Sequence, residues 1–160
     1  MKILIIGLGN YGVSLATSLI EAGNEVIGVD IDPLRVDLIK NLVTFAVTLD
    51  STNEAAVRSL PFKDVDAAIV AIGESEGAAI LTTAILKKIG VKRIISRSIS
   101  PLHQMVLEAM GIEEIVHPEQ ESADRLSKML HLKWVLNNFE VDEHFSVTEI
   151  QLGSQFAGKT

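Results

Sequence analysis

Residues 1–30 read MKILIIGLGNYGVSLATSLIEAGNEVIGVD, and the organisation of the whole chain can be inferred outward from this segment. Its residues 2–6 form a short aliphatic run, which is typical of a strand buried on both faces. Residues 13–22 predict a helix, and residues 25–29 predict a second buried strand. Asp30 follows directly, at the carboxyl end of that strand. The segment therefore predicts a strand, a turn, a helix and a strand in that order.

A glycine-rich turn joins the first strand to the helix and matches the G-x-G-x-x-G pattern of dinucleotide-binding folds. Gly7 allows the tight turn, Gly9 lets the backbone approach a pyrophosphate, and Gly12 lets the helix pack closely on the strand. The helix N-terminus then presents free N–H groups and its positive dipole end to the phosphates. Asp30 lies near the spacing expected for a carboxylate that accepts hydrogen bonds from ribose hydroxyls. We interpret these residues as a nucleotide-binding site.

The composition favours a single domain with an aliphatic core and excludes several classes of function. The chain has 160 residues, of which 48% are hydrophobic and only 4% aromatic, as is typical of parallel α/β sheets. It contains no cysteine, which excludes disulfides, thiol catalysis and cysteine metal sites. The net charge of −7 disfavours broad contact with nucleic-acid phosphates, and no apolar run is long enough to span a bilayer. We expect a cytosolic protein that neither binds nucleic acid nor inserts into the membrane.

The rest of the chain continues the alternation of strand and helix. Further strands are predicted at 44–47, 66–72, 93–97 and 114–116, and further helices at 33–42, 54–60, 78–89, 101–110 and 118–138. With right-handed crossovers, this order predicts a Rossmann-like, doubly wound parallel α/β sheet of six strands in the order 3-2-1-4-5-6. Residues 139–141 and 145–150 alternate like an edge strand.

In such a sheet the ligand crevice lies outside the carboxyl ends of strands 1 and 4, where the strand order reverses. The segments that follow strands 1 to 4 are residues 7–12, Asp30, residues 50–52 and residues 71–73. Because carboxyl ends of parallel strands meet at one edge of a sheet, we expect these segments to converge on one crevice.

The loop after the fourth strand also matches the G-x-S-x-G nucleophile elbow of hydrolases, with Ser75 as the nucleophile. Asp124 and His131 follow in the order that such a triad requires. Two glutamates flank the serine, however, and their negative charges would destabilise an oxyanion nearby. We therefore interpret the motif as a glycine-rich loop that closes over a nucleotide.

A dehydrogenase is the second alternative. The only tyrosine, Tyr11, lies in the glycine turn, so the chain has no Tyr-x-x-x-Lys pair. The segment after residue 138 is too short for a substrate domain, so an NAD-dependent oxidoreductase would have to be a cofactor-binding fragment completed by a partner.

The predicted helix over 118–138 carries more apolar residues than one stripe. They are Ala123, Leu126, Met129, Leu130, Leu132, Trp134, Val135 and Leu136. This width favours a second partner surface over packing on the chain's own sheet alone.

The histidines lack the spacing of a zinc pair, and we expect each to be a surface or capping residue. They are His103, His117, His131 and His144.

Taken together, these motifs resemble the RCK/KTN (TrkA-N) domain, the cytosolic regulatory module of bacterial Trk/Ktr potassium uptake systems and of many potassium channels. The resemblance covers Met1 to about Ile150. The residues that carry it are 7–12, Val29–Asp32, Asp50–Thr52, Val70–Gly73, Arg97, His103, Val106–Glu108 and Ile115–Glu119.

The resemblance implies a non-enzymatic switch that binds NAD(H), ATP or ADP. Members pair through the terminal helix and assemble into rings beneath a membrane-embedded potassium transporter or channel. Nucleotide exchange in the ring then gates the transporter or channel. Many members that respond to ATP have arginine where this chain has Asn10. Losing that guanidinium removes a phosphate clamp, which favours NAD or ADP.

The motifs and the resemblance together predict specific contacts and boundaries. Some members hold a cation at the dimer interface through the glutamate that corresponds to Glu119. The domain boundaries are 1–138 for the nucleotide-binding lobe and 139–160 for a terminal strand and linker, without the C-terminal ligand lobe of many members. The nucleotide contacts are Gly7, Leu8, Gly9, Asn10, Tyr11, Gly12, Asp30, Ile31, Asp32, Arg35, Asp50, Ser51, Thr52, Ala71, Ile72, Gly73, Glu76 and Arg97.

Overall fold

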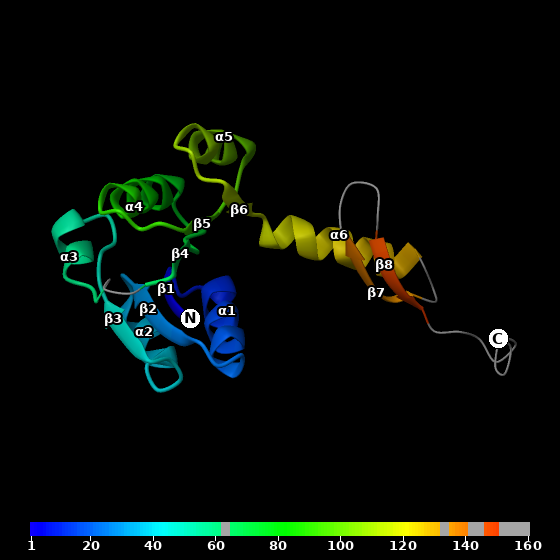
Figure 1. The fold of residues 1–160 in the computed structure, drawn as a ribbon, viewed down its shortest axis with the longest axis horizontal. Helices are drawn as coiled ribbons and strands as arrows, with labels where there is room; N and C mark the ends of the chain where they lie inside the picture. The colour runs from blue at the N-terminus through cyan, green and yellow to red at the C-terminus, as the bar shows by residue number, and fades with distance from the viewer. Residues whose placement is uncertain (62–64, 132–134, 141–145, 151–160) are drawn as a thin grey trace, which may run out of the picture. The chain divides into compact units, whose positions relative to one another are not determined.

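The structure, a computed structural model, describes residues 1–61, 65–131, 135–140 and 146–150 (Figure 1). Strands and helices alternate along the described residues from the first strand to the last helix, and the alternation ends where two strands follow each other at 135–140 and 146–150. The elements, in chain order, are β1 Lys2–Ile6, α1 Asn10–Glu21, β2 Glu25–Asp30, α2 Pro33–Ile39, β3 Phe45–Thr48, α3 Glu54–Arg58, β4 Ala67–Val70, α4 Glu76–Lys88, β5 Ile94–Arg97, α5 Pro101–Ala109, β6 Glu114–Val116, α6 Pro118–His131, β7 Val135–Glu140 and β8 Ser146–Ile150.

Strands β1 to β6 form one sheet in the order β3-β2-β1-β4-β5-β6, and every neighbouring pair is parallel. Strand β1 is central, because Ile6 is in register with Val29 of β2 on one side and with Val70 of β4 on the other. The predicted Rossmann-like fold and its strand order are confirmed. The order reverses between β1 and β4, which sets the position of the crevice.

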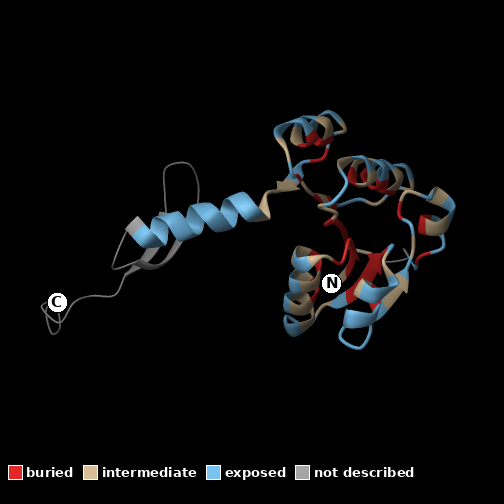
Figure 2. Cartoon of the chain, turned by 180° about the vertical axis from the view of Figure 1, so that it is seen from behind, coloured by how far each residue is buried: buried red, intermediate tan, exposed pale blue. Residues whose placement is uncertain are grey.

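The alternation of side chains along β1 divides the core into two layers. Ile3 and Ile5 pack on the face covered by α1 and α2, which contribute Ala16 and Ile39. Leu4 and Ile6 pack on the opposite face with residues of α3, α4 and α5. Both faces of the central strands are therefore covered, and Figure 2 shows most of their residues as buried. This explains why these strands are mainly aliphatic.

Contacts within the chain separate two compact units, Met1–His117 and Pro118–Thr160. In the second unit β7 and β8 pair antiparallel, with Asn138 in register with Thr148. The prediction of a helix reaching Asn138 is wrong, because α6 ends at His131 and residues 135–138 belong to β7. Asparagine and β-branched residues have low helix propensity, and pairing with β8 satisfies their backbone groups instead. The predicted domain boundary at residue 138 stays a prediction.

No helix among the described residues is long and apolar enough to cross a membrane.

Candidate functional site

The candidate site is built on the glycine loop at the carboxyl end of β1. Gly7 has φ +99°, a conformation that side chains disfavour, and its N–H donates to the carbonyl of Val29 at 2.8 Å. A Cβ at Gly7 would lie 2.8 Å from the backbone N of Ile72, the residue that follows the end of β4 by two positions. The loop thus fits between the ends of β2 and β4 only because this residue has no side chain.

The other two glycines of the loop differ in what surrounds them. A Cβ at Gly12 would overlap the carbonyl oxygen of Gly7, so α1 can pack on the loop only with glycine at this position. A Cβ at Gly9 would point into open space, with the Arg35 guanidinium at 4.0 Å as its nearest neighbour. Gly12 therefore serves packing, whereas Gly9 leaves room in front of the helix N-terminus for a ligand.

The N-terminus of α1 lacks the side-chain cap that the other helices of the first unit possess. Gly9 is its N-cap residue and has no side chain to accept from the first-turn N–H groups. The N-terminal N–H groups of α2, α3, α4 and α5 donate to Asp32, Asn53, Ser75 and Ser100 respectively. Uncapped N–H groups and the helix dipole favour an anion, so this helix end fits the pyrophosphate predicted there.

Asp30, at the end of β2, is 5% exposed and both of its carboxylate oxygens accept hydrogen bonds from the backbone. One oxygen accepts from the N–H of Leu8 at 2.6 Å, and the other accepts from the N–H of Asp32 at 2.8 Å. Because each carboxylate oxygen has a second lone pair, a ribose hydroxyl can still donate to it. Asp30 therefore has a structural task, holding the glycine loop, that its place in the motif did not predict.

Arg35 extends from α2 over the same region and is surrounded by three carboxylates. It forms an ion pair with Glu74 and lies 3.8 Å from both Asp30 and Asp32. The hydrogen bond with Glu74 raises the pKa of the Arg35 guanidinium. Glu74 was not among the predicted site residues, because only the fold brings the loop after β4 close to α2.

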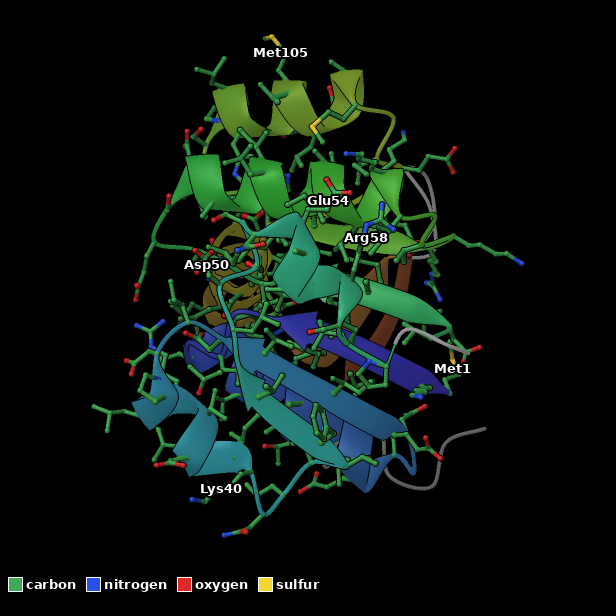
Figure 3. All side chains as sticks on the ribbon, turned by 90° about the vertical axis from the view of Figure 1, so that its left-hand side faces the viewer. Met1, Lys40, Asp50, Glu54, Arg58 and Met105 are labelled. Carbon is green, nitrogen blue, oxygen red and sulfur yellow. The ribbon has the colours of Figure 1, made fainter. Side chains whose placement is uncertain are left out.

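The loop after β3 contributes three predicted residues, which the structure uses in different ways. Asp50 lies on this loop (Figure 3), and its carboxylate accepts from the Thr52 hydroxyl at 2.7 Å and from the Thr52 N–H at 2.9 Å. The hydroxyl hydrogen bond lowers the pKa of Asp50. Ser51 is buried, and its hydroxyl shares a 2.8 Å hydrogen bond with Thr82 of α4. The Ser51 side chain thus anchors the loop to α4.

The loop after β4 approaches the glycine loop closely, and Arg97 of β5 lies against it. A Cβ at Gly73 would overlap the Arg97 guanidinium, which also lies 6.0 Å from the centre of the Tyr11 ring. Glu76 is partly exposed in the first turn of α4. Tyr11, Gly73 and Arg97 therefore come together, as expected of residues at neighbouring strand ends.

Ser75 is a helix cap. Its hydroxyl accepts from the N–H of Ala78 at 3.2 Å, and its φ of −145° is an ordinary extended conformation rather than a strained elbow. Asp124, the proposed triad partner, belongs to the second unit, and the side chain of His131 lies outside the described residues. The hydrolase interpretation receives no support from this geometry.

His103 differs from the prediction of a surface or capping histidine. It is fully buried on α5, and neither ring nitrogen has a hydrogen-bond partner among the described residues. Burial lowers the pKa of His103, and the nearby carboxylate of Glu76 opposes that shift. His117 is partly buried, and the side chains of His131 and His144 lie outside the described residues. The burial of His103 is a feature of the tertiary fold, and its position in the sequence did not distinguish it from the other histidines.

Among the described residues no group of three or more histidine, aspartate or glutamate side chains is gathered to hold a metal. Glu119 lies exposed at the start of α6, so the cation site predicted there would need ligands from a second chain. The apolar face of α6 is also exposed, at 56% for Leu126, 40% for Met129 and 73% for Leu130. Leu132 and Trp134 lie outside the described residues.

The family model that matches the chain and its similar relatives point to the same group of proteins. Residues 3–118 match the model of the TrkA-N domain. The chain is 40% identical over 156 residues to the Ktr system potassium uptake protein C of Bacillus subtilis, covering 98% of this chain and 71% of that protein. It is 33% identical over 146 residues to the Ktr system potassium uptake protein A of the same organism, covering 91% of this chain and 66% of that protein.

A solved structure with the same fold is the NAD(P)-binding domain of an exopolyphosphatase-related protein from Archaeoglobus fulgidus. It superposes with a TM-score of 0.70 at 25% sequence identity, covering 81% of this chain and 98% of that one.

Proposed function

Because this chain belongs to the TrkA-N domain family, we propose that it is a nucleotide-binding regulatory subunit of a potassium uptake system. The observation that carries the nucleotide site is the uncapped N-terminus of α1 behind Gly7, Gly9 and Gly12, with Asp30 beside it. The carboxyl ends of β1 and β4 are where open α/β sheets bind their ligands.

The ligand we propose is NAD(H) or an adenine nucleotide. The backbone N–H groups at Gly9 and after it would hold the diphosphate, and Asp30 would accept from a ribose hydroxyl. The similar solved domain is described as NAD(P)-binding. Asn10 is exposed at the start of α1 and offers no guanidinium to a third phosphate, which supports NAD or ADP over ATP.

The role we propose is regulation rather than catalysis, and the similarity of the chain to two Ktr system potassium uptake proteins supports it. In the candidate crevice the one serine with hydrolase-like spacing caps a helix. An oxidoreductase fragment remains the alternative, and oxidation of NADH by the purified protein with any substrate would favour it.

The partner we propose is a membrane-embedded transporter or channel subunit, with this chain bound at the inner face of the cell membrane. Two copies would pair through the exposed face of α6, and pairs would assemble into a ring. Glu119 from each copy would then supply ligands to a shared cation, because two bare carboxylates in proximity repel.

Thermal unfolding of the purified chain with NAD, NADH, ADP, ATP and cyclic dinucleotides tests the nucleotide site. A ligand present at a hundred times its Kd adds about 2.7 kcal/mol to the free energy of unfolding. The absence of any shift would contradict the nucleotide site. Affinity purification from membranes tests the partner, and the potassium role fails if no transporter subunit is retained.

A further inference from the structure

The ion pair between Arg35 and Glu74 crosses the candidate crevice. Arg35 belongs to α2, which follows β2, and Glu74 lies on the loop between β4 and α4. In the sheet β1 lies between β2 and β4, so a contact between these residues passes over the carboxyl end of β1. That strand end carries the glycine loop, so the pair lies across the place proposed for the diphosphate.

Distances within the site agree with this position. The Arg35 guanidinium is the group nearest to a Cβ built at Gly9, at 4.0 Å, and Gly9 is the residue that leaves room for the diphosphate. The same guanidinium lies 3.8 Å from Asp30, which is proposed to bind the ribose. The Arg35 side chain can therefore reach a phosphate at the α1 N-terminus without a movement of the α2 backbone.

The charges around Arg35 are unbalanced. Glu74, Asp30 and Asp32 together carry three negative charges against one guanidinium. Asp30 is buried and committed to backbone N–H groups, whereas Glu74 is 75% exposed and bonded to Arg35. Glu74 is the carboxylate that can withdraw into water at least cost when another anion arrives.

We propose that Glu74 is a specificity-determining residue that competes with the phosphates of the ligand for Arg35. In the empty crevice the Glu74 carboxylate holds the guanidinium across the glycine loop. A diphosphate then takes the guanidinium from Glu74, which releases the loop between β4 and α4. Glu74 thereby weakens the binding of every phosphate-bearing ligand relative to the binding of the bare nucleoside. This inference rests on the proposed nucleotide site.

The test compares ADP with adenosine, each measured by displacement of NADH fluorescence, in the wild type, Glu74→Gln, Arg35→Gln and the double variant. The control is Glu21→Gln, which removes the same charge from an exposed position at the end of α1. Exposed ion pairs are weak, so we expect Glu74→Gln to raise the ratio of the adenosine Kd to the ADP Kd by about two- to fivefold. The control should leave that ratio unchanged.

The double variant separates competition from simple repulsion. If Glu74 acts through Arg35, the effect of Glu74→Gln on the ratio disappears in the Arg35→Gln background. An effect of equal size in that background would overturn the proposal, because Glu74 would then repel phosphate by its own charge. A ratio that is the same in Glu74→Gln and in the control would overturn it as well. If wild-type protein binds neither ADP nor NADH, the proposed function fails and this inference fails with it.

Discussion

Two glycines of the same loop are expected to respond differently to the same added methyl group. Gly9→Ala should keep the fold, at a cost below about 1 kcal/mol for an N-cap position, because open space surrounds the new Cβ. Gly12→Ala should cost about 3 kcal/mol or more, because its Cβ would overlap the Gly7 carbonyl. Urea unfolding measures both changes, and calorimetry should show that Gly9→Ala weakens NAD binding. A folded Gly9→Ala protein with unchanged affinity would refute the assigned crevice.

Asp30→Ala should affect both stability and binding. The substitution leaves the buried N–H of Leu8 without its acceptor, which should cost about 1–3 kcal/mol in the free energy of unfolding. Loss of the ribose contact should lower NAD affinity by about 1.5–3 kcal/mol. Wild-type protein should also prefer NAD over NADP, since the Asp30 carboxylate repels a 2′-phosphate. Tighter binding of NADP in calorimetry would contradict the ribose role.

Single-residue roles were only partly predictable from the sequence. The places of Gly7, Gly9, Gly12 and Asp30 follow from a motif whose spacing is fixed by the turn itself. The Arg35–Glu74 pair joins residues that are far apart in the chain, and no local sequence pattern predicts this contact. The same holds for His103, whose complete burial is a tertiary feature without a local sequence signal.

At the level of secondary structure, we expect the stability of the protein to depend on pH, because α5 carries the buried residue His103. Its folded-state pKa is lowered by burial, so the unfolded chain binds the proton more readily. The stabilisation is complete above the unfolded pKa of about 6.5 and is lost as pH falls below it, by up to about 1.4 kcal/mol per pH unit. His103→Leu should flatten the urea-derived stability between pH 7.5 and 5. Carboxylates with a lowered pKa, such as Asp50, make the stability depend on pH only below about pH 4.

His117→Gln is the matched control, because His117 is only partly buried. If this variant flattens the pH dependence as much as His103→Leu does, the assignment to His103 is wrong.

Secondary structure was predictable wherever local signals were strong. Periodicity, caps and glycine stops located β1 to β6 and α1 to α5 within a few residues. The end of α6 was not predictable, because its apolar residues continue into β7 without a glycine or proline stop. Only pairing with β8 distinguishes a strand from a longer helix there.

For the whole molecule, the exposed apolar face of α6 leads us to expect a homodimer in solution. Leu126, Met129 and Leu130 are all exposed and share one helix face by their spacing. Burying such a face against a second copy removes apolar surface that monomers seldom leave open. Light scattering at tens of micromolar protein should report a dimer that Leu130→Asp weakens. A strict monomer, with or without nucleotide, would contradict the pairing.

The division of the chain has a thermodynamic consequence. The residues proposed to bind the nucleotide all belong to Met1–His117, whereas the face proposed for pairing belongs to Pro118–Thr160. If a nucleotide strengthens pairing by some factor, pairing must strengthen nucleotide affinity by that same factor, because the two free energies close one cycle. Protein concentration would then act as an effector. Nucleotide affinity measured on dilute and concentrated protein should differ by the factor that nucleotide exerts on dimerisation.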